Sequence, residues 1–270
     1  MAMSDISLTS GMRTNLLNLQ SATSLLDRTQ TRLSTGKKVN TALDNPTNFF
    51  AAQGHTNRAS DLSARKDGMS EGIQTIKAAD AGIKGITGLI EAAKGLAQSA
   101  RSADEDGRDD LSVQFDALLG QIDDLADDSG YKGINLLDSG ELTVDFNEEG
   151  DSEVKVKGFD ASSGGLGIGA ATDAWVDDED IDAAVEDLNT AQGTLRSESA
   201  ALATNLSVIN IRQDFTDEMI STLQAGADNL TLADMNEEGA NMLMLQTRQQ
   251  LGTTALSLSA QAAQSVLRLF

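Results

Sequence analysis

The sequence predicts a mainly α-helical protein whose N- and C-terminal halves pair as a long antiparallel coiled-coil rod, with a small β-hairpin insert at the outer end. Leu, Ile and Met recur at every seventh position in four stretches, two toward each end of the chain. This heptad spacing is typical of helices that pack along their length. A single proline in 270 residues leaves long stretches without the main helix breaker. Seven Phe, one Trp and one Tyr are too few for a large aromatic core, which favours thin helical packing.

Two long heptad series are predicted to form the core of the rod. Their members are Leu62, Met69, Ile76, Ile83 and Ile90 in the first half, and Ile181, Leu188, Leu195, Leu202, Ile209 and Leu223 in the second. Thr216 is the one polar member of the second series. Shorter series run from Met12 through Leu19 and Leu26 to Leu33, and from Met244 through Leu251 to Leu258. Neither end has an obvious partner nearby in sequence, so we expect the chain to fold back at the insert.

Capping and turn signals divide the first half into helices. A broad apolar face predicts a helix over 4–34, which Gly36 ends. Asp44 and Asn45 precede Pro46, a capping arrangement that opens a second helix over 46–101. That helix contains seven glycines, each of which costs about 1 kcal/mol relative to alanine. We therefore expect partner helices to hold it, and the glycines to permit close backbone approach.

The spacing of apolar residues changes in the middle of the chain. An acidic break is expected over 102–107 and a shorter helix over 109–127. Apolar residues then alternate at 142–146 and at 154–156 around a polar turn, which predicts a β-hairpin. Glycines at 164–169 indicate a loop. A helix over 178–230 and a last helix from 236 to the C-terminus complete the expected order.

The net charge of −22 is concentrated in the middle of the chain. Residues 103–187 hold 26 acidic and 4 basic side chains, whereas the two flanks together hold 16 of each. The flanks are therefore compatible with association, while the middle repels like-charged neighbours. Nucleic-acid binding is not expected, because it would need a basic face.

Targeting and membrane signals are not recognised in the sequence. The absence of cysteine means no disulfide framework, and no standard signal peptide is expected at the N-terminus. The longest uncharged stretch, 249–267, contains too many Gln, Ser and Thr residues for a bilayer span. We therefore expect a helix buried among protein neighbours and no membrane insertion.

Candidate chemistry is sparse, and we predict no enzyme, cofactor or metal site. Residues 145–153 resemble the front of a calcium loop, but Val156 stands where the bidentate glutamate is needed, so a solvated turn is expected. His55 is the only histidine and has no second ligand or triad partner. The glycines at 164–169 lack the Gly-Lys-Ser/Thr ending of a phosphate loop.

Several segments resemble bacterial flagellins, and their sequences are most similar to those of alphaproteobacterial flagellins. They are Leu33-Ser34-Thr35-Gly36-Lys37-Lys38-Val39-Asn40 with Ala42 and Asp44, Tyr131-x-Gly133-x-x-Leu136-Leu137, Ala233-Asp234-Met235, Gln249-Gln250-Leu251, and Ala262-Ala263-Gln264-Ser265-Val266-Leu267-Arg268-Leu269-Phe270. The resemblance covers both ends, about two thirds of the chain. It implies a structural subunit that polymerises into the helical flagellar filament used for swimming.

The resemblance also implies a division of labour along the chain. A terminal helical core would comprise 1–40 with 235–270, a helical rod domain 41–139 with 178–234, and a surface insert 140–177. The terminal helices would drive assembly and line the central channel. The implied filament-packing residues are Met12, Leu16, Leu19, Leu26 and Leu33, with Leu251, Leu258, Leu267, Leu269 and Phe270. Apolar residues on more than one face of these segments lead us to expect that 1–35 and 236–270 fold on assembly.

Implied partners are many copies of the chain itself, an export chaperone at the C-terminal helix, and hook-associated junction and cap proteins. The implied location is the extracellular filament, reached through the flagellar type III export channel. An animal immune receptor would contact Leu89, Lys94 and Leu96, although Gly95 replaces the acidic residue of that pattern. Surface sugars would attach to Ser162, Ser163 or Thr172.

Two other functions fit the same pattern. A hook–filament junction protein has similar terminal helices but a larger central region, so the short insert favours the filament subunit. An acidic secreted coiled-coil adhesin could also show these heptads. Elongation of short filament seeds by purified subunits distinguishes the filament subunit from an adhesin.

Overall fold

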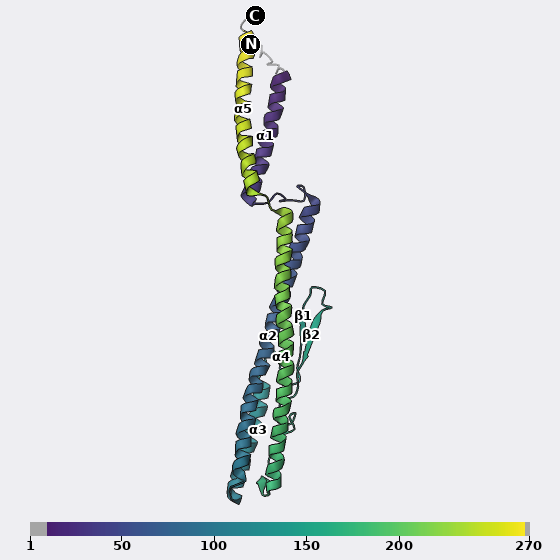
Figure 1. Ribbon diagram of the computed structural model, residues 1–270, viewed down its shortest axis with the longest axis vertical. Coiled ribbons are helices and arrows are strands. Elements are labelled where there is room, and N and C mark those ends of the chain that lie inside the picture. Colours follow the sequence, from purple (N-terminus) through teal and green to yellow (C-terminus); the bar gives the residue numbers. More distant parts are fainter. Residues whose placement is uncertain (1–9, 268–270) are drawn as a thin grey trace, which may run out of the picture. The chain divides into compact units, whose positions relative to one another are not determined.

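The computed structural model describes residues 10–267. Within this range the chain forms five α-helices, one 3₁₀ turn and a two-stranded antiparallel sheet (Figure 1). It divides into two compact units: the described residues up to Asn57 together with those from Leu223 onward, and Arg58–Thr222. Two long helices, α2 and α4, contribute residues to both units. The predicted helical class with one small hairpin is confirmed.

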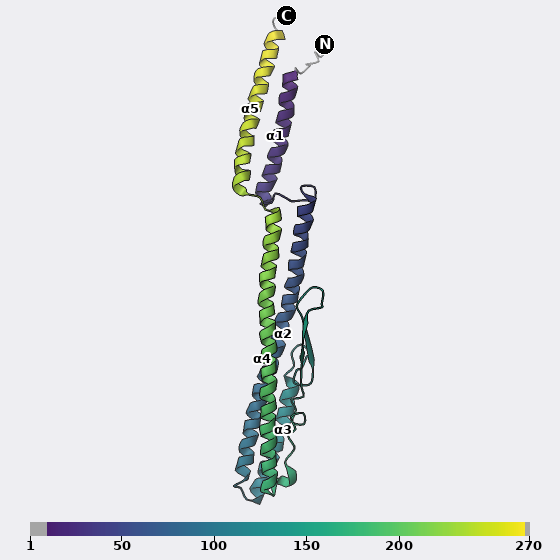
Figure 2. The same cartoon turned by 45° about the vertical axis from the view of Figure 1, so that its right-hand side comes forward.

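The first unit is built on the antiparallel pairing of α1 (Ser10–Thr35) with α5 (Met235–Leu267), which lie side by side in both views (Figures 1 and 2). Gly252 lies against Leu19, and a Cβ atom on that glycine would come within 2.8 Å of the Leu19 Cδ2 atom. The two backbones therefore approach closely at this level. Gly36 ends α1 with φ at +71°, a conformation that favours glycine. The predicted stop is confirmed, and residues 4–9 of the predicted helix lie outside the described range.

The longest helices agree with their predicted bounds. Helix α2 spans Pro46–Ala100 and α4 spans Asp178–Thr231. The Asn45 side-chain oxygen accepts a hydrogen bond from the Asn48 amide at 3.1 Å, so the predicted cap forms at the start of α2. Three acidic residues occupy the first turn of α4, where their negative charges interact favourably with the positive end of the helix dipole.

In the second unit, α3 (Glu105–Asp128) lies beside α2 and α4 and closes one continuous core (Figure 2). The predicted start at residue 109 was wrong, and the acidic break is limited to 101–104. The Asp104 side chain accepts a hydrogen bond from the Gly107 amide, and two acids follow in the first turn. Acidic residues at this position stabilise a helix start, because they cap the first amides and interact with the dipole.

The predicted hairpin is confirmed as β1 (Glu141–Asp145) paired with β2 (Glu153–Lys157). Strand β1 buries Leu142 and Val144, while its neighbouring residues remain more exposed. Arg65 forms an ion pair of 3.4 Å with Asp145, and a Cβ atom on Gly72 would meet Val144 at 2.7 Å. The hairpin therefore lies along the flank of α2, well before that helix ends, which differs from the expected place at the outer end.

Three of the seven glycines in α2 permit close approach of other segments. Gly72 faces the hairpin, Gly82 faces Ser129 and Leu137, and Gly85 faces Leu125. A Cβ atom at each position would come closer than ordinary van der Waals contact. The other four, at 54, 68, 88 and 95, face no other segment within 4 Å. The expected role of the glycines is therefore limited to the part of α2 that contacts α3, the loop after it and the hairpin.

A left-handed turn, η1 (Thr172–Trp175), precedes α4 and was not predicted. Residues 173–175 have φ between +44° and +59°, which is unfavourable for residues with side chains. The indole of Trp175 is buried and its ring centroid lies 4.9 Å from that of Phe115. Arg108 donates hydrogen bonds to the carbonyl oxygens of Trp175 and Val176, at 3.3 and 2.9 Å. Aromatic burial and these hydrogen bonds hold the turn in place.

Candidate assembly surfaces

The two long heptad series lie in the interior of the chain. All eleven core residues predicted from them are buried, with exposed fractions between 0 and 8%. Thr216, the polar member, is also buried, and its hydroxyl donates to the Arg212 carbonyl oxygen one turn earlier at 2.8 Å. The hydroxyl is therefore satisfied within the helix, so the threonine does not interrupt the packing.

The shorter terminal series are divided between buried and exposed positions. Met12 is 8% exposed, and Leu19, Leu26 and Leu33 are half-buried. Leu16, Leu251 and Leu258 are exposed by 38, 65 and 61%. Leu269 and Phe270 lie outside the described residues, as does the side chain of Leu267. Met244, the first member of the C-terminal series, is exposed by 46%, and heptad spacing does not indicate the further exposed apolar side chains of the same two helices, Leu17, Leu25 and Leu243. A monomer thus leaves much of the apolar surface of α1 and α5 in solvent.

Two hollows open between α1 and α5. The larger has a volume of about 430 Å³ and is lined by Leu19, Leu25 and Leu245 together with polar groups that include Arg248. The smaller, of about 320 Å³, lies between Met12 and Leu16 on one helix and Leu256 and Ala260 on the other. The paired helices therefore present exposed ridges and unfilled hollows. Helices pack by placing the ridges of one into the grooves of another, so this surface is suited to packing against further helices.

A network of polar contacts joins the segment after α1 to the segment between α4 and α5. The Lys38 amide donates to the Thr231 carbonyl oxygen at 2.7 Å, and the Ala233 amide donates to the Gly36 carbonyl oxygen at 2.9 Å. These two segments are almost 200 residues apart in sequence, yet each satisfies backbone groups of the other. We call this arrangement the clasp, defined by 36–39 and 231–233.

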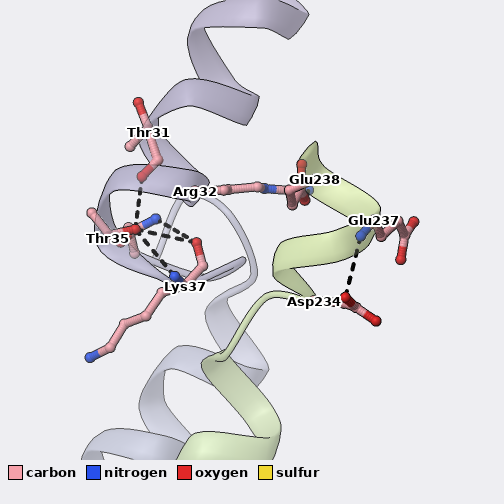
Figure 3. A network of polar contacts seen from close by, with 8 residues as sticks. Thr31, Arg32, Thr35, Lys37, Asp234, Glu237 and Glu238 are labelled. Carbon is pink, nitrogen blue, oxygen red and sulfur yellow. Dashed lines mark hydrogen bonds and ion pairs between the residues drawn. The ribbon is translucent and has the colours of Figure 1, made fainter. Parts of the chain in front are cut away.

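An ion pair reinforces the clasp. Figure 3 shows Arg32 reaching Glu238, with 2.7 Å between the Nη1 and Oε1 atoms. The Glu238 side chain is only 8% exposed, so the Arg32 guanidinium compensates a carboxylate that is largely removed from water. Asp234 accepts a hydrogen bond from the Glu237 amide (Figure 3) and another from the Asn236 amide, and thereby caps the start of α5. The sequence predicts a break between residues 230 and 236 but not this ion pair, because no periodicity indicates it.

A tight turn follows the clasp and leads into α2. The Asp44 carboxylate accepts hydrogen bonds from the backbone of Thr41 and Asn40, at 3.0 and 3.1 Å, and from the Thr41 hydroxyl. The backbone hydrogen bonds from Thr41 and then Asn40 lower the pKa of Asp44 below its ordinary value of 3.8. This turn displays Leu43 with 96% of its surface exposed.

The residues implied as a receptor patch are engaged within the chain. Leu89 and Leu96 are half-buried against the core. The Lys94 ammonium group donates to the side-chain oxygen of Asn189 on α4 at 2.6 Å. These contacts give the three side chains a packing role between helices.

The residues implied as sugar sites differ in accessibility. The Ser162 hydroxyl donates to Asp160 at 2.6 Å, and the Ser163 hydroxyl donates to Asp123 at 3.2 Å. The hydrogen bonds from the Ser162 hydroxyl and amide lower the pKa of Asp160. Thr172 is exposed, and no hydrogen bond of its side chain is recorded among the described residues. Of the three, Thr172 is the most accessible hydroxyl.

The segment that resembles a calcium loop forms the hairpin turn. The Asn147 side-chain oxygen accepts hydrogen bonds from the amides of Gly150 and Ser152, at 3.0 and 3.3 Å. Over residues 10–267, no three His, Cys, Asp or Glu side chains gather as metal ligands. His55 lies half-buried in α2 beside Gly226. In the part of the chain that the structure covers, no helix has the length and apolar character needed to cross a bilayer.

Comparison with known proteins shows the family of this chain. Residues 6–141 match the family model of the bacterial flagellin N-terminal helical region, and residues 179–270 match that of the C-terminal helical region. Flagellin FljM of Caulobacter vibrioides is 32% identical over 100% of both chains. A flagellin of Brucella melitensis is 27% identical over 99% of both chains. The crystal structure of Bacillus cereus flagellin has a TM-score of 0.48 and 18% identity, and the match covers 55% of this chain and 88% of that chain.

A helical subunit with paired terminal helices and matches at both ends defines a filament-forming structural protein. The chain belongs to the bacterial flagellin family, and its full-length relatives agree with the alphaproteobacterial type. It is a subunit of the flagellar filament. These matches favour neither a hook–filament junction protein nor an adhesin.

Proposed function

We propose that α1 and α5 drive filament assembly and line its central channel. The observation that supports this proposal is the exposure of Leu16, Leu251 and Leu258 on two helices that are already paired with each other. Burying a leucine side chain stabilises by about 1.5–3 kcal/mol. Contact with helices of neighbouring copies supplies that burial, so assembly is favoured over the isolated subunit.

We also propose the division of the chain that its resemblance to flagellins implies. Residues 1–40 with 235–270 form the terminal core, 41–139 with 178–234 form the helical rod domain, and 140–177 form the surface insert. The filament-packing role extends to Met12, Leu19, Leu26 and Leu33, and to Leu267, Leu269 and Phe270. The core series from Leu62 to Ile90 and from Ile181 to Leu223 stabilises the rod domain. We further propose that the terminal segments fold, and adopt the helix pairing of α1 with α5, as the subunit assembles.

Export and capping partners complete the proposal. The subunit leaves the cell through the flagellar type III export channel, with a chaperone held on its C-terminal helix. Junction and cap proteins contact the two ends of the extracellular filament. The chain acts as a structural polymer and not as an enzyme. Thr172 is the proposed site of any surface sugar, because its hydroxyl is more accessible than those of Ser162 and Ser163.

Deletion of residues 236–270 tests the role of the terminal helices. We expect a soluble subunit that no longer elongates seeds of native filament, measured by light scattering and electron microscopy. The fluorescence of Trp175, the only tryptophan, reports whether the second unit stays folded. Elongation at the wild-type rate would contradict the proposal.

Two full-length variants test whether elongation depends on the exposed apolar side chains of α5 or only on the presence of that helix. We expect Leu251→Ser with Leu258→Ser to slow elongation strongly, because both exposed side chains lose their apolar surface. Thr254→Ser changes an exposed position of the same helix by one methyl group and serves as the control. Equal rates for the two variants would show that apolar contacts of α5 do not drive assembly.

A further inference from the structure

Arg248 is the only basic residue of α5, and the two acidic residues of that helix lie in its first turn. It is the only charged residue between Gly239 and Leu267, and it is exposed. Its side chain lines the hollow of about 430 Å³ between α1 and α5, beside Asn15, Asn18 and Ser21. No ion pair of Arg248 is recorded within residues 10–267. A guanidinium group that loses water on assembly needs a carboxylate to compensate its charge.

Asp27 is the matching solitary carboxylate. It is the only acidic residue of α1, it is exposed, and it has no recorded ion pair among the described side chains. Asn15, Asn18 and Ser21, the polar neighbours of Arg248 in the hollow, carry no charge. The two terminal helices thus contain one unpaired anion on α1 and one unpaired cation on α5.

The two charges face different directions within one copy. The α1 side chains buried against α5 include Ala22 and Thr29. At about 100° per residue, Asp27 points about 140° away from Ala22 and about 160° away from Thr29. Asp27 therefore lies on the outer face of α1, on the side opposite α5. Arg248 follows the buried Leu245 by three positions and stays at the edge of the hollow.

The pairing register separates the two charges along the axis as well. Leu19 lies against Gly252, and Arg32 pairs with Glu238. Arg248 is therefore level with residues 22 and 23 of α1, about 6–8 Å along the helix from Asp27. The different directions of the two side chains and their separation along the helix axis keep Asp27 and Arg248 of one copy apart.

We propose that the Asp27 carboxylate of one copy enters the hollow of a neighbouring copy and binds Arg248 there. This inference rests on the proposed role of α1 and α5 as assembly surfaces. The outer face of α1 and the hollow are different surfaces, so the contact is heterologous and each copy can receive one neighbour while entering another. Heterologous contacts generate closed rings or open helical polymers, and the flagellar filament is an open helical polymer. The asparagines and the serine around Arg248 supply further hydrogen-bonding groups for the incoming carboxylate.

A charge exchange in the full-length subunit tests the pairing. The single variants Asp27→Arg and Arg248→Glu each place two like charges at the contact. Each variant subunit is added to short filament seeds made of the same variant. We expect the elongation rate of each single variant to be at least about tenfold lower than that of wild type on wild-type seeds. The double variant carries both substitutions and restores opposite charges between copies. We expect its rate to return to within about threefold of wild type, as like-charge repulsion is removed.

Two control variants make the outcome specific. Gln250→Glu adds a negative charge two positions from Arg248 on an exposed site, and we expect it to remain within about threefold of wild type. Glu237→Arg combined with Arg248→Glu should stay slow, because Glu237 lies in the first turn of α5, far along that helix from Arg248, and the exchange leaves Asp27 opposite a negative charge. Far-ultraviolet circular dichroism and Trp175 fluorescence of each monomer check folding.

The inference is overturned if the Asp27–Arg248 double variant is as slow as the single variants. It is also overturned if Arg248→Glu elongates normally, if Gln250→Glu is equally slow, or if the Glu237 exchange restores the rate. Each of these results leaves filament assembly by the wild type intact. Failure of the wild-type subunit itself to elongate seeds would contradict the proposed function instead.

Discussion

The close approach of helices at Gly82 predicts opposite effects for two identical substitutions in α2. A Cβ atom at Gly82 would lie 2.5 Å from the Leu137 Cδ1 atom, 2.9 Å from the Ser129 Cβ atom, and closer still to the Ser129 hydroxyl. A Cβ atom at Gly88 would meet nothing within 4 Å. Both positions lie in the interior of the same helix, so the propensity gain of alanine is the same, about 1 kcal/mol.

The two substitutions therefore differ only in packing. Gly88→Ala should stabilise the subunit by about 1 kcal/mol. Gly82→Ala gains the same amount but forces Ser129 and Leu137 aside, and overpacking of this kind costs about 1–3 kcal/mol. Because the nearest atoms include the base of the Ser129 side chain, we expect the upper part of that range and a net loss of about 1–2 kcal/mol.

Thermal unfolding of the monomeric full-length subunit measures this difference. Trp175 is fully buried in the same unit, so its fluorescence follows the unfolding of that unit. For a domain of this size, about 1 kcal/mol shifts Tm by about 2–4 °C. Gly88→Ala should raise Tm and Gly82→Ala should lower it. Shifts of the same sign for both variants would refute the close packing of α2 against the end of α3 and the loop that follows it.

Two further predictions concern the clasp and the turn after it. Glu238→Gln removes the charge that pairs with Arg32, and we expect a loss of about 1–2 kcal/mol together with faster hydrogen exchange at the Lys38 amide; unchanged exchange would exclude a role for the pair. The lowered pKa of Asp44 means that its charged form stabilises the turn above the ordinary pKa of 3.8, and that this contribution disappears as the pH falls through the folded-state pKa. Amide NMR of Thr41 between pH 6 and 2 should show this transition, and Asp44→Asn should abolish it.

Heptad periodicity identified the buried residues of α2 and α4 because the apolar face of each helix packs against other elements of the same chain. Positions such as Ile76 and Ile209 recur at the spacing that keeps one face against a neighbouring helix, and both are buried. The same periodicity could not separate Met12 from Leu251, since α1 and α5 cover only one face of each other. Met12 lies in their contact and Leu251 is exposed.

Local signals located helix ends where a side chain next to the helix satisfies its first or last backbone groups. Asn45 and Gly36 are examples of such signals. They failed at α3, where the acids after Asp104 indicated a break but belong to the first turn. The left-handed turn before α4 carries no sequence signal, because the buried indole of Trp175 and the side chain of Arg108 hold it from other elements.

The sequence by itself determined the helical class, the hairpin, the long packing series and the concentration of negative charge between the two ends. These properties follow from spacing and composition, which act over a few residues. Only the tertiary structure decided that Glu238 is held by Arg32, that Gly82 and not Gly88 receives another segment, and that Arg248 faces a hollow while Asp27 faces outward. Those outcomes depend on the register between distant segments, and a pattern repeated every seven residues is compatible with several registers.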